Sequence, residues 1–167
     1  MPDDMKLEDV ADPAYSPGLF DESLPVILLR ARIAVTACFR PVLTQHELTD
    51  AQWRVIKVLA GSGPMDVSEL SRRTDLLAPS ISRIVRDLGV RGVTSRTTPP
   101  QDARRSIVGL TDQGEALVDK LQKAVTPIHH HLDGLLGEDK KDLKRILARL
   151  TAALSASLPE GWQQGEE

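Results

Sequence analysis

The chain has 167 residues, of which 41% are hydrophobic and 27% are charged, a composition typical of one folded domain or of two small lobes with a shared core. No apolar run approaches the ~18 to 20 residues that a membrane-spanning helix needs, so no membrane partner is expected. The acidic N-terminus lacks the basic and apolar pattern of a secretion signal. A single cysteine, Cys38, excludes an internal disulfide and a zinc site built from cysteines. These features favour a cytoplasmic protein.

Charge is distributed unevenly along the chain, although the formal total is only −3 at pH 7. Residues 1–22 hold seven acidic residues against one lysine, and residues 159–167 add three glutamates, so we interpret these segments as an acidic arm and an acidic tail. Residues 67–111 instead hold eight arginines and four acidic residues. Because a phosphate-binding surface depends on the local charge, this basic middle segment is compatible with a nucleic-acid partner.

Apolar residues at helical spacing predict a long first helix that begins at Leu24. Pro41 is expected to bend or end this helix, because proline removes a backbone donor and clashes with the preceding turn. Thr49 and Gln52 have the spacing of a capping box, which predicts that a second helix begins there and ends at Gly61.

The remaining chain predicts a short strand, two short helices, a two-stranded hairpin and two longer helices. In chain order these are a strand over residues 65–67, a helix over residues 68–74, a helix from Pro79, strands over residues 93–98 and 106–110, a helix capped by Thr111 and a helix from Glu138. Pro127 predicts a kink in the first of the two longer helices. The order α-α-β-α-α-β-β-α-α indicates a mainly α fold with a small β-hairpin wing, that is, a winged helix-turn-helix with flanking helices.

A helix-turn-helix followed by a hairpin is a geometry that binds double-stranded DNA, with the second helix in the major groove and the wing against the backbone. In the helix from Pro79, apolar spacing turns Ile81, Val85 and Leu88 inward and leaves hydroxyls and arginines outside. On composition alone, an ordinary solvated helix face is an equal alternative. The candidate DNA-binding residues are Ser68, Pro79, Ser80, Ser82, Arg83, Arg86, Arg96, Arg104 and Arg105.

Two motifs resemble the MarR family of transcriptional regulators. Leu110–Thr111–Asp112–Gln113–Gly114 resembles its LT-x-x-G junction, and Asp102–Ala103–Arg104–Arg105 resembles its D-x-R wing signature. The resemblance implies a homodimer in which residues 23–48 and 112–158 form dimerisation helices and residues 49–111 form the DNA-binding lobe. Within the wing, Arg104 either pairs with Asp102 to hold its shape, contacts a backbone phosphate, or does both.

The segments 29–32, 39–43, 48–49 and 52–56 resemble the HpaR-type branch, which regulates homoprotocatechuate degradation and implies release from DNA by a phenolic acid. Independently, Arg32 falls on the apolar stripe of the first helix, where a guanidinium needs a partner such as a ligand carboxylate. His46 would then form a hydrogen bond with the phenol of the ligand, and the Trp53 ring would form a flat wall of the site. Alternatively, Arg32 pairs with an acid of the dimer partner, Trp53 belongs to the core and His46 to the surface.

The residues 129–131 are consecutive histidines that point about 100° apart on a helix, so one ion cannot bind all three, and no metal or cofactor is expected. Cys38 is expected to be a small buried hydrophobic residue, with oxidation sensing as the alternative. No nucleophile elbow or phosphate loop indicates an enzyme. The expected function is a dimeric DNA-binding regulator, a repressor released by a small aromatic acid. The alternatives are a redox-responsive regulator that uses Cys38 and an architectural DNA-binding dimer.

Overall fold

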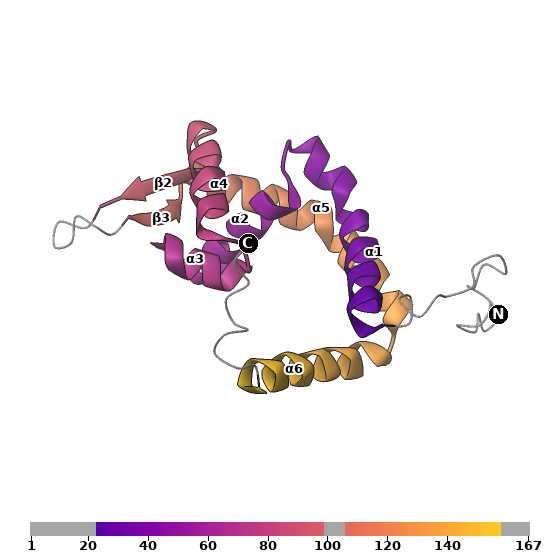
Figure 1. The fold of residues 1–167 in the computed structure, drawn as a ribbon. Helices are drawn as coiled ribbons and strands as arrows, with labels where there is room; N and C mark the ends of the chain where they lie inside the picture. The colour runs from indigo at the N-terminus through magenta and orange to yellow at the C-terminus, as the bar shows by residue number, and fades with distance from the viewer. Residues whose placement is uncertain (1–22, 99–105, 158–167) are drawn as a thin grey trace.

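The computed structural model describes residues 23–98 and 106–157, which form six helices and a three-stranded sheet in the predicted order (Figure 1). The elements are α1 (Leu24–Gln45), α2 (Asp50–Ser62), β1 (Met65–Asp66), α3 (Val67–Thr74), α4 (Ala78–Val90), β2 (Thr94–Thr97), β3 (Ile107–Leu110), α5 (Asp112–Leu136) and α6 (Asp139–Ser157). The predicted mainly α fold with a small hairpin is therefore confirmed.

Side-chain caps fix where three of the helices begin. The predicted capping box of α2 is present: the Gln52 amide donates to Thr49 Oγ1 at 3.2 Å, and the Thr49 amide donates to Gln52 Oε1 at 3.0 Å. Thr111 caps α5 as predicted, accepting from the Gly114 amide at 3.1 Å. Asp66 caps α3 by accepting from the Glu69 amide at 2.8 Å, a cap that had not been predicted.

Pro41 does not end α1, which continues past it to Gln45. A proline this close to a C-terminus removes only one hydrogen bond, and the end of the helix is held by burial of Leu43 and Leu48 in the core. The Leu48 amide also donates to the Leu43 carbonyl at 2.9 Å, which closes the turn after the helix.

The sheet has the order β1-β3-β2, with both pairs antiparallel. Met65 pairs with Val108 across β1 and β3, and Thr97 pairs with Ile107 where β2 and β3 leave the lobe. The predicted wing residues Asp102, Arg104 and Arg105 lie outside the described residues.

The hydrophobic core lies in the lobe formed by α2, α3, α4, the sheet and the first half of α5. Its fully buried side chains include Ile56, Leu70, Ile81, Leu88, Val108 and Leu121. Helix α1 runs away from this lobe beside α5, and α6 lies apart from the lobe (Figure 1); in the described part of the chain α1 buries only Leu43 and α6 buries no residue.

The expected burial of Cys38 and of the stripe that carries Arg32 is wrong within a single chain: both residues are exposed. Phe39 and Val42, further along α1, pack against the core, but no described segment covers Arg32 or Cys38. None of the described helices is both long and apolar enough to cross a membrane.

Candidate DNA-binding face and ligand cleft

Helix α4 has the inner and outer faces that its sequence predicts. Ile81, Val85 and Leu88 are buried, which anchors the helix to the lobe. The predicted DNA-binding residues of this helix are all exposed: Pro79, Ser80, Ser82, Arg83 and Arg86. Hydroxyls near the N-terminus of a helix and arginines along the same face are the groups that approach phosphates and base edges.

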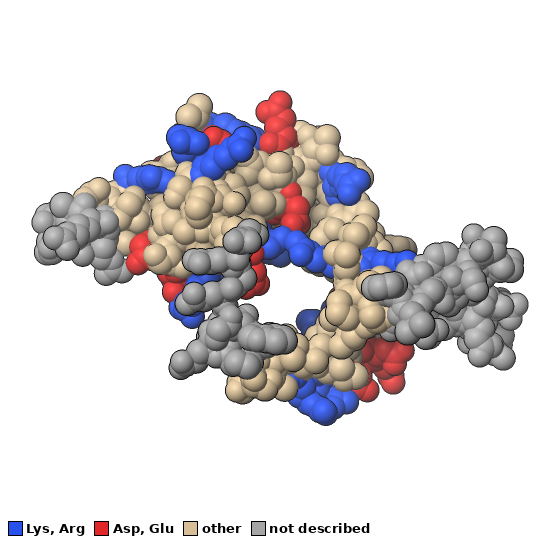
Figure 2. All heavy atoms as spheres, in the orientation of Figure 1, with Lys and Arg blue, Asp and Glu red and all other residues tan. Residues whose placement is uncertain are grey.

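The arginines of α3 and α4 differ in how far their charge is compensated. In α3, hydrogen bonds from Arg72 and then Arg73 lower the pKa of Glu69, so this carboxylate is ionised between two arginines. In α4, Arg83 Nε lies 4.0 Å from Asp87 Oδ2, and Arg86 has no ion pair within the described residues. The α4 arginines are therefore the freer cations. Lys and Arg atoms gather over α4 in Figure 2.

The remaining predicted DNA-binding residues flank α4. Ser68 is exposed at the start of α3. Arg96 on β2 is exposed, and its guanidinium donates to the Ser82 carbonyl at 3.3 Å, which joins the base of the wing to α4. A hydrogen bond between wing and helix fixes the angle at which both would meet a duplex.

An open cleft of about 590 Å³ lies between α1, α2 and the turn that follows α3. Its lining residues are Arg32, Thr36, Phe39, Asp50, Trp53, Arg54, Lys57, Asp75 and Leu76. Two of the three predicted effector residues, Arg32 and Trp53, therefore meet in one cleft. Trp53 is buried, with 8% of its surface exposed, so it is both part of the core and a wall of the cleft.

Trp53 also separates this cleft from a smaller hollow of about 310 Å³ between α2 and α5. Val125 and His129 line the α5 side of the hollow, and the His129 ring lies 5.2 Å from the Phe39 ring. Lys57, which had not been predicted, lines both spaces, and its Nζ lies 5.9 Å from the centre of the Trp53 ring. Lys57 lies four residues after Trp53 and therefore on the same face of α2, so the spacing in the sequence could have predicted it.

The third predicted effector residue, His46, lies elsewhere, so the expected grouping with Arg32 and Trp53 is wrong. His46 follows the last turn of α1 and lines a separate hollow with Arg91 and Lys120. Within the described residues, no group of three His, Cys, Asp or Glu side chains is arranged to hold a metal ion, and the run 129–131 forms none.

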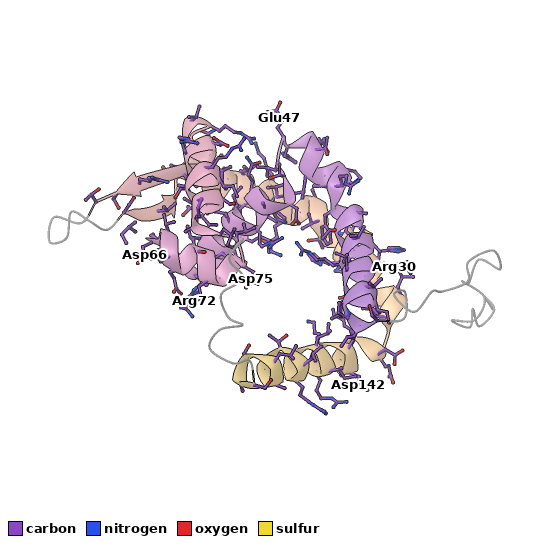
Figure 3. All side chains as sticks on the ribbon, in the orientation of Figure 1. Arg30, Glu47, Asp66, Arg72, Asp75 and Asp142 are labelled. Atoms are coloured by element: carbon purple, nitrogen blue, oxygen red, sulfur yellow. The ribbon has the colours of Figure 1, made fainter. Side chains whose placement is uncertain are left out.

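Arg54 joins the cleft to the helix-turn-helix. Its guanidinium donates to the Thr74 carbonyl at 2.9 Å and to Asp50 Oδ2 at 2.8 Å. Asp75, which ends α3 with a left-handed φ of 51°, lies in the same turn and lines the cleft (Figure 3). The cleft is therefore in direct contact with the segment that orients α4.

A winged helix-turn-helix whose second helix presents serines and arginines is the architecture of a DNA-binding protein. The MarR family model matches residues 46–105. The chain is 35% identical over 138 residues to the HTH-type transcriptional regulator FarR of Neisseria gonorrhoeae, covering 80% of this chain and 94% of FarR. It is 33% identical over 132 residues to the homoprotocatechuate degradative operon repressor of Escherichia coli, covering 78% and 89%. The chain belongs to the MarR family of transcriptional regulators.

Solved structures of similar proteins agree with this assignment. NadR in complex with 4-hydroxyphenylacetate has a TM-score of 0.72 at 33% identity, covering 80% of this chain and 98% of NadR. The transcriptional repressor CouR bound to a 23-mer DNA duplex has a TM-score of 0.70 at 31% identity, covering 82% and 98%. The predicted resemblance to HpaR-type regulators and the prediction that the chain is not an enzyme are confirmed by these relatives.

Proposed function

We propose that the chain is a cytoplasmic, homodimeric repressor that binds a pseudo-palindromic operator and leaves it when a small aromatic acid enters the cleft beside Trp53. One observation carries the proposal: this cleft contains an aromatic wall and three cations, Arg32, Arg54 and Lys57, and it borders the turn that sets the position of α4.

Operator binding is supported by the exposed face of α4 and by its hydrogen bond with the wing through Arg96. Residues 49–111 would form the DNA-binding lobe, with Arg104 and Arg105 as further backbone contacts. A two-fold dimer presents two such lobes, so the half-sites should be about 10 base pairs apart, centre to centre. CouR, whose structure includes a DNA duplex, has the same fold.

Dimerisation is supported by the large apolar side chains that α1 and α6 leave exposed. They include Leu24, Ile27, Ile33, Leu143, Ile146 and Leu154. Apolar patches of this kind mark interaction surfaces, and a two-fold interface between identical faces is the simplest way to cover them. Residues 23–48 and 112–158 would supply that interface.

Ligand binding is supported by the chemistry of the cleft. The Trp53 ring offers an apolar face, while Arg32 and Lys57 are cations that have no ion pair within the described residues. An aromatic carboxylate matches this arrangement, because its ring can pack on Trp53 while its charge meets the guanidinium or the ammonium. NadR, 33% identical to this chain, was solved with 4-hydroxyphenylacetate.

Release of DNA would follow from the position of Arg54. A carboxylate beside this guanidinium competes with the Thr74 carbonyl and Asp50 for its donors, and loss of the Thr74 bond frees the turn before α4. A ligand shifts such an equilibrium only if it binds the two states with different affinity, and this competition supplies the difference.

The test uses a duplex selected from a random pool for binding to the full-length protein. We expect a mobility shift that 4-hydroxyphenylacetate reverses and that benzyl alcohol, a neutral aromatic control, does not. Release only by peroxide, abolished in Cys38→Ser, would instead favour the redox regulator, for which the exposure of Cys38 is the supporting observation. Binding that no small molecule reverses would favour an architectural dimer.

A further inference from the structure

A third hollow, of about 280 Å³, lies where the end of α1, the end of α4 and the first three turns of α5 meet. Its lining residues are His46, Arg91, Val93, Gln113, Ala116, Leu117 and Lys120. It shares no residue with the cleft or the hollow on either side of Trp53, so the proposed effector site does not account for it.

The hollow carries uncompensated positive charge. His46, Arg91 and Lys120 come from three different segments, and no acidic residue is among the lining residues. Within the described residues, none of the three forms an ion pair. Glu47, next to His46 in the chain, extends its side chain outward from the end of α1 in Figure 3, and Asp112, Glu115 and Asp119, which adjoin lining residues of α5, are not themselves lining residues. Two convergent cations, Arg91 and Lys120, with no acidic lining residue raise the local concentration of anions, and the His46 ring adds a further polar group.

Arg91 is held in place before any ligand arrives. Its guanidinium donates to the Glu47 carbonyl at 2.7 Å and to the His46 carbonyl at 3.0 Å. The Gln113 side-chain amide donates in turn to the Arg91 carbonyl at 3.2 Å. Neutral carbonyl partners immobilise the guanidinium without cancelling its charge, so binding an anion requires little further ordering.

Helix α5 supplies one continuous side of the hollow. Its residues Gln113, Ala116, Leu117 and Lys120 follow the i, i+3, i+4, i+7 spacing and therefore share a face. Lys120 lies at one end of that face, and Ala116 and Leu117 lie between it and Gln113. The resulting space is small, cationic and partly apolar.

We propose that this hollow is a second anion site, which binds a small oxyanion with two charges through His46, Arg91 and Lys120. This chemistry is shared by sulfate, inorganic phosphate and short dicarboxylates. A bound dianion would join the C-terminal end of α4 to α1 and α5, and it would stabilise the folded protein as any ligand of the native state does.

Sulfate and succinate serve as probes in calorimetric titrations of the full-length protein, with ionic strength held constant by chloride. Lys120→Gln and His46→Gln should each weaken binding of the probe at least tenfold, about 1.4 kcal/mol. Lys123→Gln is the matched control, because Lys123 is an exposed lysine on the same helix outside the hollow, and it should bind like the wild type. Circular dichroism checks that each variant is folded.

Binding of both probes supports a site for any small dianion, and binding of succinate alone supports a dicarboxylate site selected by the apolar wall. Equal affinity in wild type and in folded Lys120→Gln would overturn the proposal, as would no measurable binding of either probe. If Lys120→Gln weakens operator binding while sulfate affinity stays unchanged, the cluster contacts the DNA backbone and the proposed site is wrong.

Discussion

Gly114 lies against the carbonyl of Val93: a Cβ at position 114 would be 2.2 Å from that oxygen. The same carbonyl accepts the Thr111 amide at 3.2 Å, and the Thr111 hydroxyl donates to the neighbouring Gly92 carbonyl. The LT-x-x-G junction is therefore a packing requirement. Threonine caps α5 and binds the end of the α4–β2 turn, and glycine lets the first turn of α5 approach that turn.

Gly114→Ala should destabilise the protein by about 2 to 3 kcal/mol, because the contacting atom is backbone and cannot move aside as a side chain would. Gly134→Ala is the control: it is also in α5, and a Cβ there would meet nothing within 4 Å. Replacing this exposed helical glycine should stabilise the protein by roughly 0.5–1 kcal/mol. Urea denaturation measures both changes, and a Gly114→Ala midpoint equal to that of the wild type would refute the packing argument.

Arg83→Ala should weaken binding to the selected operator by about 1–3 kcal/mol and relax the preference at one base position, as expected for a side chain that contacts a base edge. Arg145→Ala removes an exposed arginine from α6, outside the proposed DNA-binding face, and should leave operator affinity unchanged. Competition between the operator and mutated duplexes measures the affinity and the base preference of both variants. Uniform loss across all duplexes would place Arg83 on the phosphate backbone instead.

Arg32→Ala and Lys57→Ala test the two cations of the cleft that form no ion pair within the described residues. We expect near-wild-type melting and operator affinity, because both residues are exposed and without an ion pair in the described chain, together with an at least tenfold weaker response to 4-hydroxyphenylacetate, about 1.4 kcal/mol. The measurement is the acid concentration that releases half of the bound duplex. Early melting of Arg32→Ala would indicate a structural ion pair with the dimer partner, and a normal response of both variants would move the ligand away from this cleft.

Arg54→Gln tests the connection between the cleft and α4. Removing the donor to the Thr74 carbonyl should lower the free energy of opening this turn by about 1–2 kcal/mol. Amide hydrogen exchange in the turn at residues 74–77 should accelerate, while exchange in the core of α5 stays the same. Operator binding should weaken even without acid. Arg40→Gln, an exposed arginine of α1, is the control. Unchanged exchange in the turn would show that Arg54 does not hold it.

Ile146→Asp tests dimerisation, since this side chain is 53% exposed on the apolar face of α6. A buried, unpaired carboxylate in the interface should convert the dimer to monomers at micromolar concentration. Ala152→Asp places the same charge on the opposite face of α6 and should leave the dimer intact. Sedimentation velocity gives the masses, and a dimer in both variants would exclude α6 from the interface.

Local rules accounted for most of the fold. The caps at Thr49 and Thr111 and the two faces of α4 depend on residues within a turn or two of each other, so spacing was sufficient to predict them. The spacing predicted the faces of α1 on which Arg32 and Cys38 lie, but not their burial. Phe39 and Val42 of the same helix pack against the core, whereas no described segment covers Arg32 or Cys38.

The site was predicted less completely, because side chains that are close in sequence can lie on different sides of a helix end. His46 and Trp53 flank the turn between α1 and α2, and that turn directs them into separate hollows. Lys57 shares a helix face with Trp53, and the spacing of the two residues could have predicted that both line one site. The bonds from Arg91 to the His46 and Glu47 carbonyls join residues more than forty positions apart, and no local pattern predicts them.

Because α6 buries no residue in the described part of the chain, its folding has little support from the rest of its own subunit. An isolated helix of this length is marginal in water. In the proposed dimer the helix would gain its stability when two subunits meet, so assembly and the last step of folding would be one event. The melting temperature should then rise with protein concentration, and freshly synthesised chains would complete α6 only after finding a partner.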